Sequence, residues 1–413
     1  MPFFLNKNPK TYLVLGKIEE MTTDAEKYAL RGVSANKTDV HNAIQGLEKG
    51  LFPLAFCKIL PDFAAGDPDF CNIMHADTAG TKTSLAYLYW RETGDLSVWK
   101  GIVQDAIVMN LDDMACVGCV QDIILSSTIG RNKNLISGDV IKTLIEATVE
   151  FADKMQAHGI NIHLAGGETA DVGDIVRTID VGYTAFARMP RKQLIINDIQ
   201  AGNVIVGFAS HGQATYEDSY NGGMGCNGLT SARHDVLNHF YAESYPDSFD
   251  PNTPKEVVYV GSKKLTDVLT IENQAITVGK LLLSPTRTYL PVIKKILDFT
   301  EGVGIHGIIH STGGGQTKVS KFIKNKHVIK DNLLPIPPLF EMIQNESKTD
   351  WREMYQVFNM GQRLEVYCNE EVVESLLDIA KSFNIAAQII GYVENTEGGE
   401  RVTITSPYGV FEY

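Results

Sequence analysis

Residues His163–Asp171, HLAGGETAD, place two glycines, a glutamate and a threonine directly after an apolar run. The preceding residues 137–158 have helical spacing, with Ser137 as a plausible N-cap. The following residues 174–189 alternate like a long strand. Because strands and helices alternate throughout the chain, we predict an α/β or α+β fold. A tight turn needs the glycines but not the glutamate, whereas a phosphate or metal site could use all of these residues.

The length and composition of the chain are those of an ordinary globular protein. Its 413 residues predict two or three domains, with 44% hydrophobic and 21% charged residues. The net charge of −13 argues against non-specific nucleic-acid binding, although a metal ion could still bridge acids to phosphates. No apolar run approaches the roughly 20 residues of a membrane span, and no signal peptide is visible. We therefore expect a cytoplasmic protein without membrane or nucleic-acid partners.

Six cysteines are scattered along the chain, which suits a reduced compartment. Cys116 and Cys119 form one CxxC inside a predicted helix, but no second pair follows. We therefore expect buried, unreactive thiols rather than a zinc or redox site.

A polar segment that contains a proline and a glycine, MPRKQLIINDIQAGN, begins at Met189 and indicates a domain boundary near residue 190. The chain divides accordingly into an N-terminal extension (1–27), a first domain (28–189) and a second domain (190–413).

Two further segments stand apart from the alternating pattern. Residues 1–20 look detached, and Met21 reads well as a start, so one hypothesis makes them an upstream translation extension. Mass spectrometry of the natural product would test this, since a product retaining Phe3 rejects it. Residues 241–275 are rich in Pro, Asp and Ser and predict a surface insertion.

The segment HADTAGTK, residues 75–82, contains the first candidates for chemistry. Asp77 is a hard oxygen ligand, and Gly80 allows close approach of the backbone to a ligand. Thr81 can donate a hydrogen bond, and Lys82 is a mobile positive charge for a phosphate. The spacing is not that of a Walker A loop, and an ordinary turn with an exposed lysine is the alternative.

Three acids interrupt the apolar pattern of a predicted helix at residues 101–118. At about 100° per residue, Asp105 and Asp112 lie within roughly 20° of each other, and Asp113 is about 80° away. Their neighbours are hydrophobic, so we expect these acids near buried surface with a metal or a cation close by. The alternative is one buried acid that caps a loop and two solvated acids.

Two glycine-rich stretches are candidate anion sites. In AGGETAD, Glu168 is a candidate ligand or base, and Gly166 and Gly167 free backbone N–H groups to face an anion. In HSTGGGQTK, three glycines follow Thr312 and form a second candidate cradle. Three successive glycines cost folding entropy, which argues against a mere linker.

Seven motifs occur in one order: HADTAGTK, QDAIVMNLDD, AGGETAD, CNGLTSARHDVL, SPTRTYL, HSTGGG and FNMG. This order resembles the phosphoribosylformylglycinamidine cyclo-ligase (aminoimidazole ribonucleotide synthetase) family, over about residues 28–407. The resemblance implies a two-domain fold. An N-terminal ATP-binding and dimerisation domain (28–189), whose strands pair across a homodimer, is followed by a C-terminal α/β substrate-binding domain (190–413). It also implies ATP-dependent cyclisation of formylglycinamidine ribonucleotide to aminoimidazole ribonucleotide, with release of ADP and phosphate, in de novo purine biosynthesis.

The resemblance also implies roles for individual residues. Catalytic roles fall on Asp113, Glu168 and Lys82, and Mg²⁺ ligands on Asp77, Asp105 and Asp113. The contacts to ATP fall on Asp77, Gly80, Thr81, Lys82, Asp105, Gly166, Gly167 and Thr169. The contacts to the ribonucleotide fall on Asn227, Gly228, Thr312, Gly313, Gly314 and Gly315. Helix geometry favours Asp112 beside Asp105, whereas the family motif favours Asp113, and we follow the motif.

The chain departs from the family pattern at several positions. Thr78 replaces the first glycine of Asp-Gly-Val-Gly-Thr-Lys, and Asp112 stands where the family usually has asparagine. In the second domain, Gly225 occupies the place of a histidine, for which His211 is a candidate substitute or an exposed loop residue. Arg363 replaces a small residue after FNMG, and could meet a substrate phosphate or lie on a strand surface.

Two rival functions stay open. One is another ATP-using member of the superfamily, such as selenophosphate synthetase or thiamine-monophosphate kinase, although Cys57–Lys58 is a poor match for a reactive cysteine beside a lysine. The other is a catalytically reduced scaffold that binds nucleotide, motivated by the missing histidine. Retention of Asp77, Lys82 and Glu168 argues against the scaffold.

Overall fold

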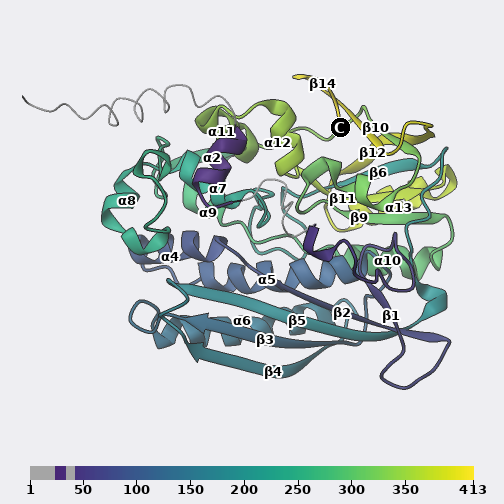
Figure 1. The fold of residues 1–413 in the computed structure, drawn as a ribbon, viewed down its shortest axis with the longest axis horizontal. Coiled ribbons are helices and arrows are strands. Elements are labelled where there is room, and N and C mark those ends of the chain that lie inside the picture. The colour runs from purple at the N-terminus through teal and green to yellow at the C-terminus, as the bar shows by residue number, and fades with distance from the viewer. Residues whose placement is uncertain (1–23, 34–41) are drawn as a thin grey trace, which may run out of the picture.

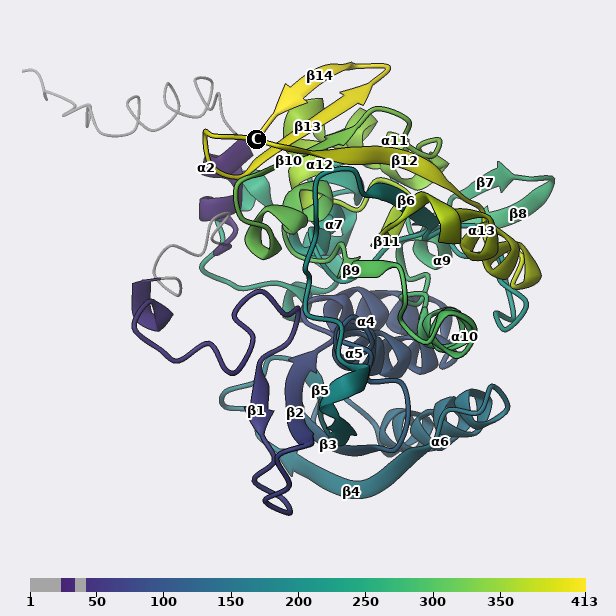
Figure 2. The same cartoon turned by 90° about the vertical axis from the view of Figure 1, so that its right-hand side faces the viewer.

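The computed structural model describes residues 24–33 and 42–413, so the hypothesis about residues 1–20 lies outside the described part of the chain. The described chain contains two large mixed β-sheets, one from residues 59–190 and one from residues 204–412. Helices α4 and α5 lie between the first sheet and the second domain, as Figures 1 and 2 show from two directions. The predicted α/β class is therefore confirmed.

The first sheet has five strands in the order β1-β2-β5-β3-β4, with β3 and β4 parallel and the other pairs antiparallel. Helices α5 and α6 pack together on one face of this sheet. The elements of this part, with the preceding helix, are α2 (Asp24–Leu30), β1 (Ile59–Pro61), β2 (Phe70–Thr78), α4 (Lys82–Thr93), α5 (Val98–Ala115), β3 (Ile123–Arg131), α6 (Gly138–Gln156), β4 (Ile162–Asp171), β5 (Ile179–Pro190) and η1 (Arg191–Gln193).

The stretch HLAGGETAD forms no tight turn and lies within a strand, β4. The strand β4 continues to Asp171, because its backbone pairs with β3 as far as Arg131. Gly166 has a φ of 80°, at the point where the register with β3 shifts. This conformation suits glycine and is typical of an irregularity in a strand pair.

Helix α5 confirms the prediction that the acids of residues 101–118 lie near buried surface. Asp105 and Asp112 are 0% exposed, and Asp113 is 8% exposed. The helix contacts strands β2 and β5 on one side and helix α10 on another, which removes its polar side chains from solvent. The alternative with two solvated acids is therefore wrong.

The second sheet has seven strands in the order β14-β13-β10-β12-β6-β11-β9. Its strands are β6 (Val204–Ala209), β9 (Ile305–His310), β10 (Lys326–Lys330), β11 (Gln362–Cys368), β12 (Ala387–Asn395), β13 (Arg401–Ser406) and β14 (Gly409–Glu412). The α-helices of this half are α7 (Leu229–Val236), α8 (Phe240–Ser244), α9 (Val278–Leu282), α10 (Leu290–Thr300), α11 (Pro338–Ser347), α12 (Trp351–Val357) and α13 (Val373–Ser382). A hairpin, β7 (Val268–Ile271) and β8 (Gln274–Thr277), and the 3₁₀ turns η2 (Pro246–Ser248), η3 (Lys255–Val257), η4 (Gly315–Phe322) and η5 (Glu370–Val372) complete it.

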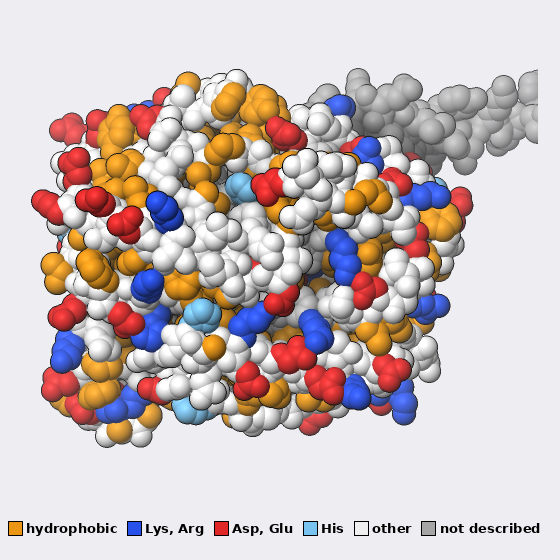
Figure 3. All heavy atoms as spheres, turned by 180° about the vertical axis from the view of Figure 1, so that it is seen from behind, with side chains coloured by type: hydrophobic (Ala, Val, Ile, Leu, Met, Phe, Trp, Pro, Cys, Tyr) orange, Lys and Arg blue, Asp and Glu red, His pale blue; other side chains and the backbone are white. Residues whose placement is uncertain are grey.

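On the face shown in Figure 3, basic and acidic side chains of the described residues are interspersed with apolar ones. Within residues 24–33 and 42–413, every helix is too short or too polar to cross a bilayer.

The segment 241–275 is only partly the surface insertion that its composition predicts. Tyr241 and Tyr259 are 0% exposed, and the hydroxyl of Tyr241 donates to Glu92 of α4 at 2.7 Å. Arg31, in the turn directly after α2, donates to the carbonyl of Val257 at 3.0 Å. The segment therefore packs against α4 and the turn after α2. Its composition does not show this, because the apolar surface comes from a few aromatic residues among many Pro, Asp and Ser residues.

His234 lies in this packed region and should make stability depend on pH. It is 2% exposed, and its Nδ1 accepts a bond from the backbone N–H of Tyr259 at 3.3 Å. Burial, with Arg233 and Arg31 nearby, lowers the pKa of His234 well below its usual value. The folded protein therefore keeps the ring neutral to lower pH than the unfolded chain, which protonates it below about pH 6.5. Its stabilising effect is fully present above that pH and is lost as the pH falls.

We expect the loss of unfolding free energy caused by His234→Gln to be smaller at pH 5.0 than at pH 7.5, by at most about 2 kcal/mol. Urea denaturation of variant and wild type at both pH values measures this difference. A loss that is the same at both pH values would show that folding leaves the pKa of His234 unchanged.

Candidate functional site

Segments of both domains meet around helix α5 and the end of strand β2. Thr81 at the start of α4 shares a hydroxyl–hydroxyl bond of 2.7 Å with Thr230 of α7. Asp105 on α5 bonds to Thr286, and Asp113 on α5 bonds to His310 at the end of β9. The candidate site therefore lies between the two domains.

Lys82 is not the mobile surface lysine that the sequence predicts. Its ammonium donates to Asp105 Oδ1 at 2.8 Å and to the carbonyl of Ser284 at 2.6 Å, and both charged side chains are 0% exposed. The same Asp105 oxygen accepts bonds from the N–H and hydroxyl of Thr286 at 2.7 and 2.6 Å. Lys82 and Asp105 thus form a buried ion pair that holds the segment 284–286 against the first domain.

Asp112 faces the same segment of the second domain as Asp105. Its two oxygens accept bonds from the Thr288 hydroxyl and the Tyr289 N–H, each at 2.7 Å. The helix spacing that places Asp105 and Asp112 on one face is therefore confirmed. Burial raises the pKa of Asp112 to about 7, against these two bonds. The two acids dock the segment 284–289 onto α5.

Asp113 points elsewhere, toward two histidines. Its Oδ1 accepts a bond from His310 Nδ1 at 2.7 Å, and its Oδ2 lies 3.6 Å from His75 Nε2. Burial would raise the pKa of Asp113, but Lys318 and His310 outweigh it and hold the pKa below its usual value. Burial raises the pKa of the neighbouring Asp77, and the charge of Asp113 adds to that rise.

His310 connects Asp113 to Arg363. Its Nε2 accepts a bond from Arg363 Nε at 3.0 Å, so Nδ1 carries the hydrogen that faces Asp113. Burial lowers the pKa of His310 to about 4, which keeps the ring neutral. Arg363 is 1% exposed and also donates to the carbonyl of Arg287. The alternative of an arginine on a strand surface is therefore wrong.

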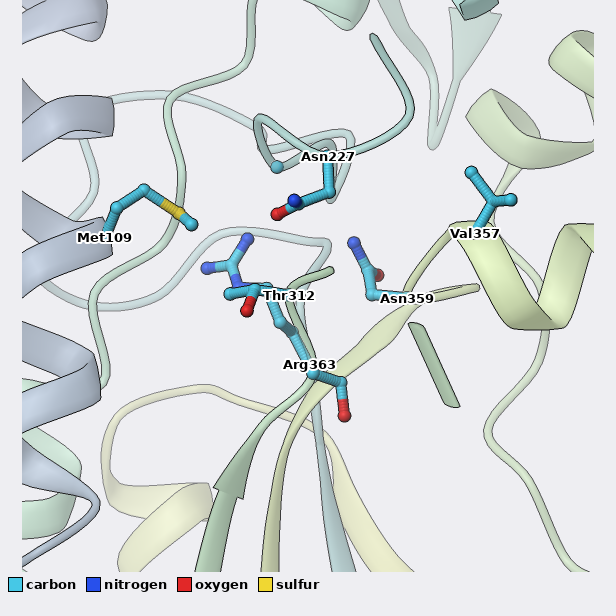
Figure 4. Close-up of a pocket in the computed structure, with 8 residues that line it drawn as sticks. Met109, Asn227, Thr312, Val357, Asn359 and Arg363 are labelled. Atoms are coloured by element: carbon cyan, nitrogen blue, oxygen red, sulfur yellow. The ribbon is translucent and has the colours of Figure 1, made fainter. Parts of the chain in front are cut away.

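A small cavity lies beside Arg363, at the centre of Figure 4. Met109 faces it from α5, while Asn227, Thr312, Asn359 and Arg363 point toward one another from the second domain. The lining residues are Met109, Gly225, Asn227, Ser311, Thr312, Val357, Asn359 and Arg363. Two residues that the family resemblance selected, Asn227 and Thr312, therefore lie together in one cavity.

The glycine-rich turn after Thr312 needs its glycines. Gly314 and Gly315 have φ values of 99° and 50°, and a Cβ on Gly315 would lie 2.6 Å from two carbonyl oxygens. A Cβ on Gly313 would lie 3.2 Å from the amide nitrogen of Asn227, so the turn passes close beside that residue. Gly228, with a φ of 78°, packs against the ring of Phe358. The structure thus brings the second-domain candidates together.

The candidates on β4 lie apart from this cavity. Gly166, Gly167 and Glu168 are exposed and Thr169 borders them on the edge strand, with β5 and β3 between β4 and the strand of Asp77. In the described part of the chain, no three His, Cys, Asp or Glu side chains are arranged to hold a metal ion. Asp77 and Asp113 lie near each other, whereas the Oδ1 of Asp105 is already bonded to Lys82.

The structure shows where the residues near the missing family histidine lie. The Nδ1 of His211 lies 3.2 Å from the carbonyl of Gly361, and the residue does not line the cavity. Cys226 lies 3.9 Å from the Thr286 hydroxyl, and burial raises the pKa of its thiol to about 12. Neither residue replaces the missing histidine beside Arg363.

The sequence analysis missed four residues of the site. His75 lies two positions before Asp77 on the same strand, so the two-residue period of a strand places both on one face. His310, Lys318 and Asn359 stand within or beside quoted motifs, but only the structure shows their contacts. The ammonium of Lys318 donates to the Thr312 hydroxyl and lies 4.7 Å from the Phe56 ring centre.

Comparison with known proteins gives one consistent result. Residues 62–189 match the family model "AIR synthase related protein, N-terminal domain", and residues 200–404 match the corresponding "C-terminal domain" model. Among curated relatives, phosphoribosylformylglycinamidine cyclo-ligases of Methanocaldococcus jannaschii and Methanococcus vannielii are 29% and 27% identical over 328 and 331 residues. Each alignment covers 79% of this chain and 79% of the relative.

Solved structures share the fold at low sequence identity. T. maritima PurL complexed with FGAR is 15% identical with a TM-score of 0.52, and the match covers 97% of this chain and 54% of that one. This chain therefore spans about half of that structure. The HypE-HypF complex contains a chain that is 14% identical with a TM-score of 0.52, covering 91% and 98% of the two chains.

Proposed function

Because this chain belongs to the AIR synthase related protein family, we propose that it is a phosphoribosylformylglycinamidine cyclo-ligase. It would use ATP to close formylglycinamidine ribonucleotide into aminoimidazole ribonucleotide, with release of ADP and phosphate, in de novo purine biosynthesis. The names of the curated relatives support this activity. The fold is also that of T. maritima PurL, of which structures complexed with FGAR and with ADP have been solved.

One observation carries the proposal: polar groups from both domains converge at a single cavity. Asp113 of the first domain reaches Arg363 of the second through the neutral ring of His310. Asn227 and the turn that begins at Thr312 line the cavity next to Arg363. A reaction that joins a nucleotide triphosphate and a ribonucleotide needs such a position, where two ligands can be held in contact.

The proposed reaction has two steps. The terminal phosphoryl group of ATP passes to the formyl oxygen, and ADP leaves. The amidine nitrogen then attacks the formyl carbon, the carbon–oxygen bond breaks, and phosphate leaves with that oxygen as the nitrogen loses a proton. Such chemistry depends mostly on positioning and charge stabilisation. The backbone N–H groups of Gly313 and Gly314 and the ammonium of Lys318 would bind phosphate oxygens, and the ionised Asp113 would hold a proton or a cation. The N–H of Gly315 donates to the carbonyl of Thr312 within the turn.

The donor set fits Mg²⁺ only in part. Mg²⁺ is usually held by one or two carboxylates together with substrate phosphates, where it neutralises phosphate charge. Asp77 and Asp113 would supply two carboxylates, which agrees with that requirement. Asp105 fits less well, because the ammonium of Lys82 already balances its charge.

We place a homodimer contact on the outer face of the first sheet. Met74 and Ile124 are 60% and 43% exposed, and both pair with Phe186 of β5, so they share one face. The edge strand β4, with Glu168, lies on the same sheet. A second subunit would cover these apolar side chains, in agreement with the family resemblance. A monomer in sedimentation equilibrium would contradict this assignment.

A coupled assay tests the proposed function. Purified protein is incubated with formylglycinamidine ribonucleotide, ATP and Mg²⁺, and aminoimidazole ribonucleotide and ADP are measured together. We expect equal amounts of both products, and neither product when Mg²⁺ is chelated. ADP without the imidazole would point to another phosphoryl acceptor. Neither product, with ATP still bound, would favour a scaffold.

A further inference from the structure

The guanidinium of Arg363 is buried, and no carboxylate among the described residues lies within ion-pair distance of it. Its Nε donates to His310 and its Nη2 to the carbonyl of Arg287, which are both neutral acceptors. Its Nη1 has no hydrogen-bond partner among the described residues, and no carboxylate there forms an ion pair with Arg363. A buried charge without a partner is costly, so this arrangement indicates that Nη1 faces an anionic ligand.

A second donor points to the same place. The hydroxyl of Ser311, a residue that is 2% exposed, is likewise without a partner in the described chain, and Ser311 lines the cavity with Arg363. The backbone N–H of Ser311 donates to the carbonyl of Arg363 at 2.6 Å, which fixes the two residues relative to each other. The cavity measures about 10 Å³, which is room for about one oxygen-sized atom.

The position of Gly225 explains why the cavity exists. A Cβ on Gly225 would lie 3.7 Å from Arg363 Nη1, so a larger side chain at residue 225 would fill the space before the guanidinium. Gly225 stands where the family pattern has a histidine, and Arg363 stands where it has a small residue. In this chain the loop has no side chain at residue 225, and the guanidinium of Arg363 comes to this place from β11.

We propose that Arg363 Nη1 and Ser311 Oγ together bind one phosphoryl oxygen of a substrate in this cavity. The inference rests on the proposed function, because phosphoryl groups carry the anionic oxygens of both ATP and the ribonucleotide. The oxygen comes either from the phosphate of the ribonucleotide or from the phosphoryl group taken from ATP. His310 and Asp113 act as positioning residues that hold the guanidinium in place.

Ser311→Ala is the decisive variant, because the Ser311 hydroxyl bonds to none of the described residues. Ser231→Ala is a matched control, since Ser231 is 3% exposed, also has a hydroxyl without a partner in the described ranges, and does not line the cavity. We expect Ser311→Ala to lower kcat/KM by ~10-fold, as for loss of a bond to a charged group, and Ser231→Ala to stay within twofold. Arg363→Gln should lower kcat/KM further.

The kinetic constants identify the source of the oxygen. A higher KM for formylglycinamidine ribonucleotide at unchanged kcat would assign the oxygen to the phosphate of that ribonucleotide. A lower kcat at unchanged KM for both substrates would assign it to the phosphoryl group from ATP. The subsite is wrong if the wild type forms aminoimidazole ribonucleotide while Ser311→Ala and a folded Arg363→Gln both keep kcat/KM within twofold.

Inorganic phosphate supplies a readout that does not depend on turnover. We expect phosphate to raise the thermal unfolding midpoint of wild type and Ser231→Ala by more than that of Ser311→Ala. If this difference is present but no aminoimidazole ribonucleotide forms, the proposed function fails while the phosphate subsite stands. Equal stabilisation of the three proteins would overturn the subsite.

Discussion

Replacing Asp113 by asparagine is expected to lower kcat for aminoimidazole ribonucleotide formation by about a thousandfold, with little change in stability. Asparagine keeps an oxygen that can accept the bond from His310 Nδ1, so the buried contact can persist. Asparagine has no negative charge, whereas Lys318 and His310 keep the carboxylate of Asp113 ionised by lowering its pKa. Whether that charge holds Mg²⁺ or a proton, its loss removes the function. Steady-state kinetics and urea denaturation measure the two effects.

Asp112→Asn provides the matched control, since it changes the neighbouring residue in the same way. Asp112 accepts bonds from Thr288 and Tyr289, and an asparagine would place an N–H₂ group against one of these donors. We expect Asp112→Asn to lower the free energy of unfolding by about 1–3 kcal/mol and to leave kcat within tenfold. If the two variants lowered kcat equally, Asp113 would act through docking of the domains and not through a ligand.

Replacing Lys82 by methionine is expected to lower the free energy of unfolding by about 3–5 kcal/mol. Methionine has a similar volume, but it leaves the carboxylate of Asp105 buried without its cation and the carbonyl of Ser284 without its donor. The Oδ2 of Asp105 already has no partner among the described residues, so the site has no spare donor. Urea denaturation followed by circular dichroism measures the loss.

A surface ion pair provides the comparison for Lys82. Lys100 of α5 pairs with Glu150 at 2.7 Å, and the two side chains are 50% and 56% exposed. Lys100→Met should lower the free energy of unfolding by less than about 1 kcal/mol, because solvent screens that pair. If Lys82→Met were no more destabilising than Lys100→Met yet abolished activity, Lys82 would bind a phosphate, as its motif predicts.

The acids of α5 show what helical spacing can predict and what it cannot. Spacing alone places Asp105 and Asp112 on one face, and the structure confirms it. Helical spacing could not identify the second-domain partners of Asp105 and Asp112, which lie 176–181 residues further along the chain. Following the family motif to Asp113 also selected the acid that faces the histidines and Lys318. Helical spacing therefore predicted which acids share a face, and the family motif predicted which acid lies in the candidate site.

Arg363 shows the opposite case, in which the sequence left two alternatives. Strand β11 alternates its side chains between two faces, but all seven of its residues are buried because both faces are covered. Alternation therefore could not tell whether Arg363 faced solvent or a ligand. Only the tertiary contacts of its side chain with His310 and with the carbonyl of Arg287 settled its position.

The sequence by itself determined the α/β class, the burial of the helix acids and the order of the motifs, because these depend on residues within a few turns or on fixed spacings. The tertiary structure alone decided that Lys82 is held by Asp105, that β4 carries Glu168 on an exposed edge, and that Arg363 Nη1 has no partner among the described residues. These features depend on contacts between segments that are distant along the chain. Burial at those contacts determines the desolvation cost of each charge and the strength of its ion pairs.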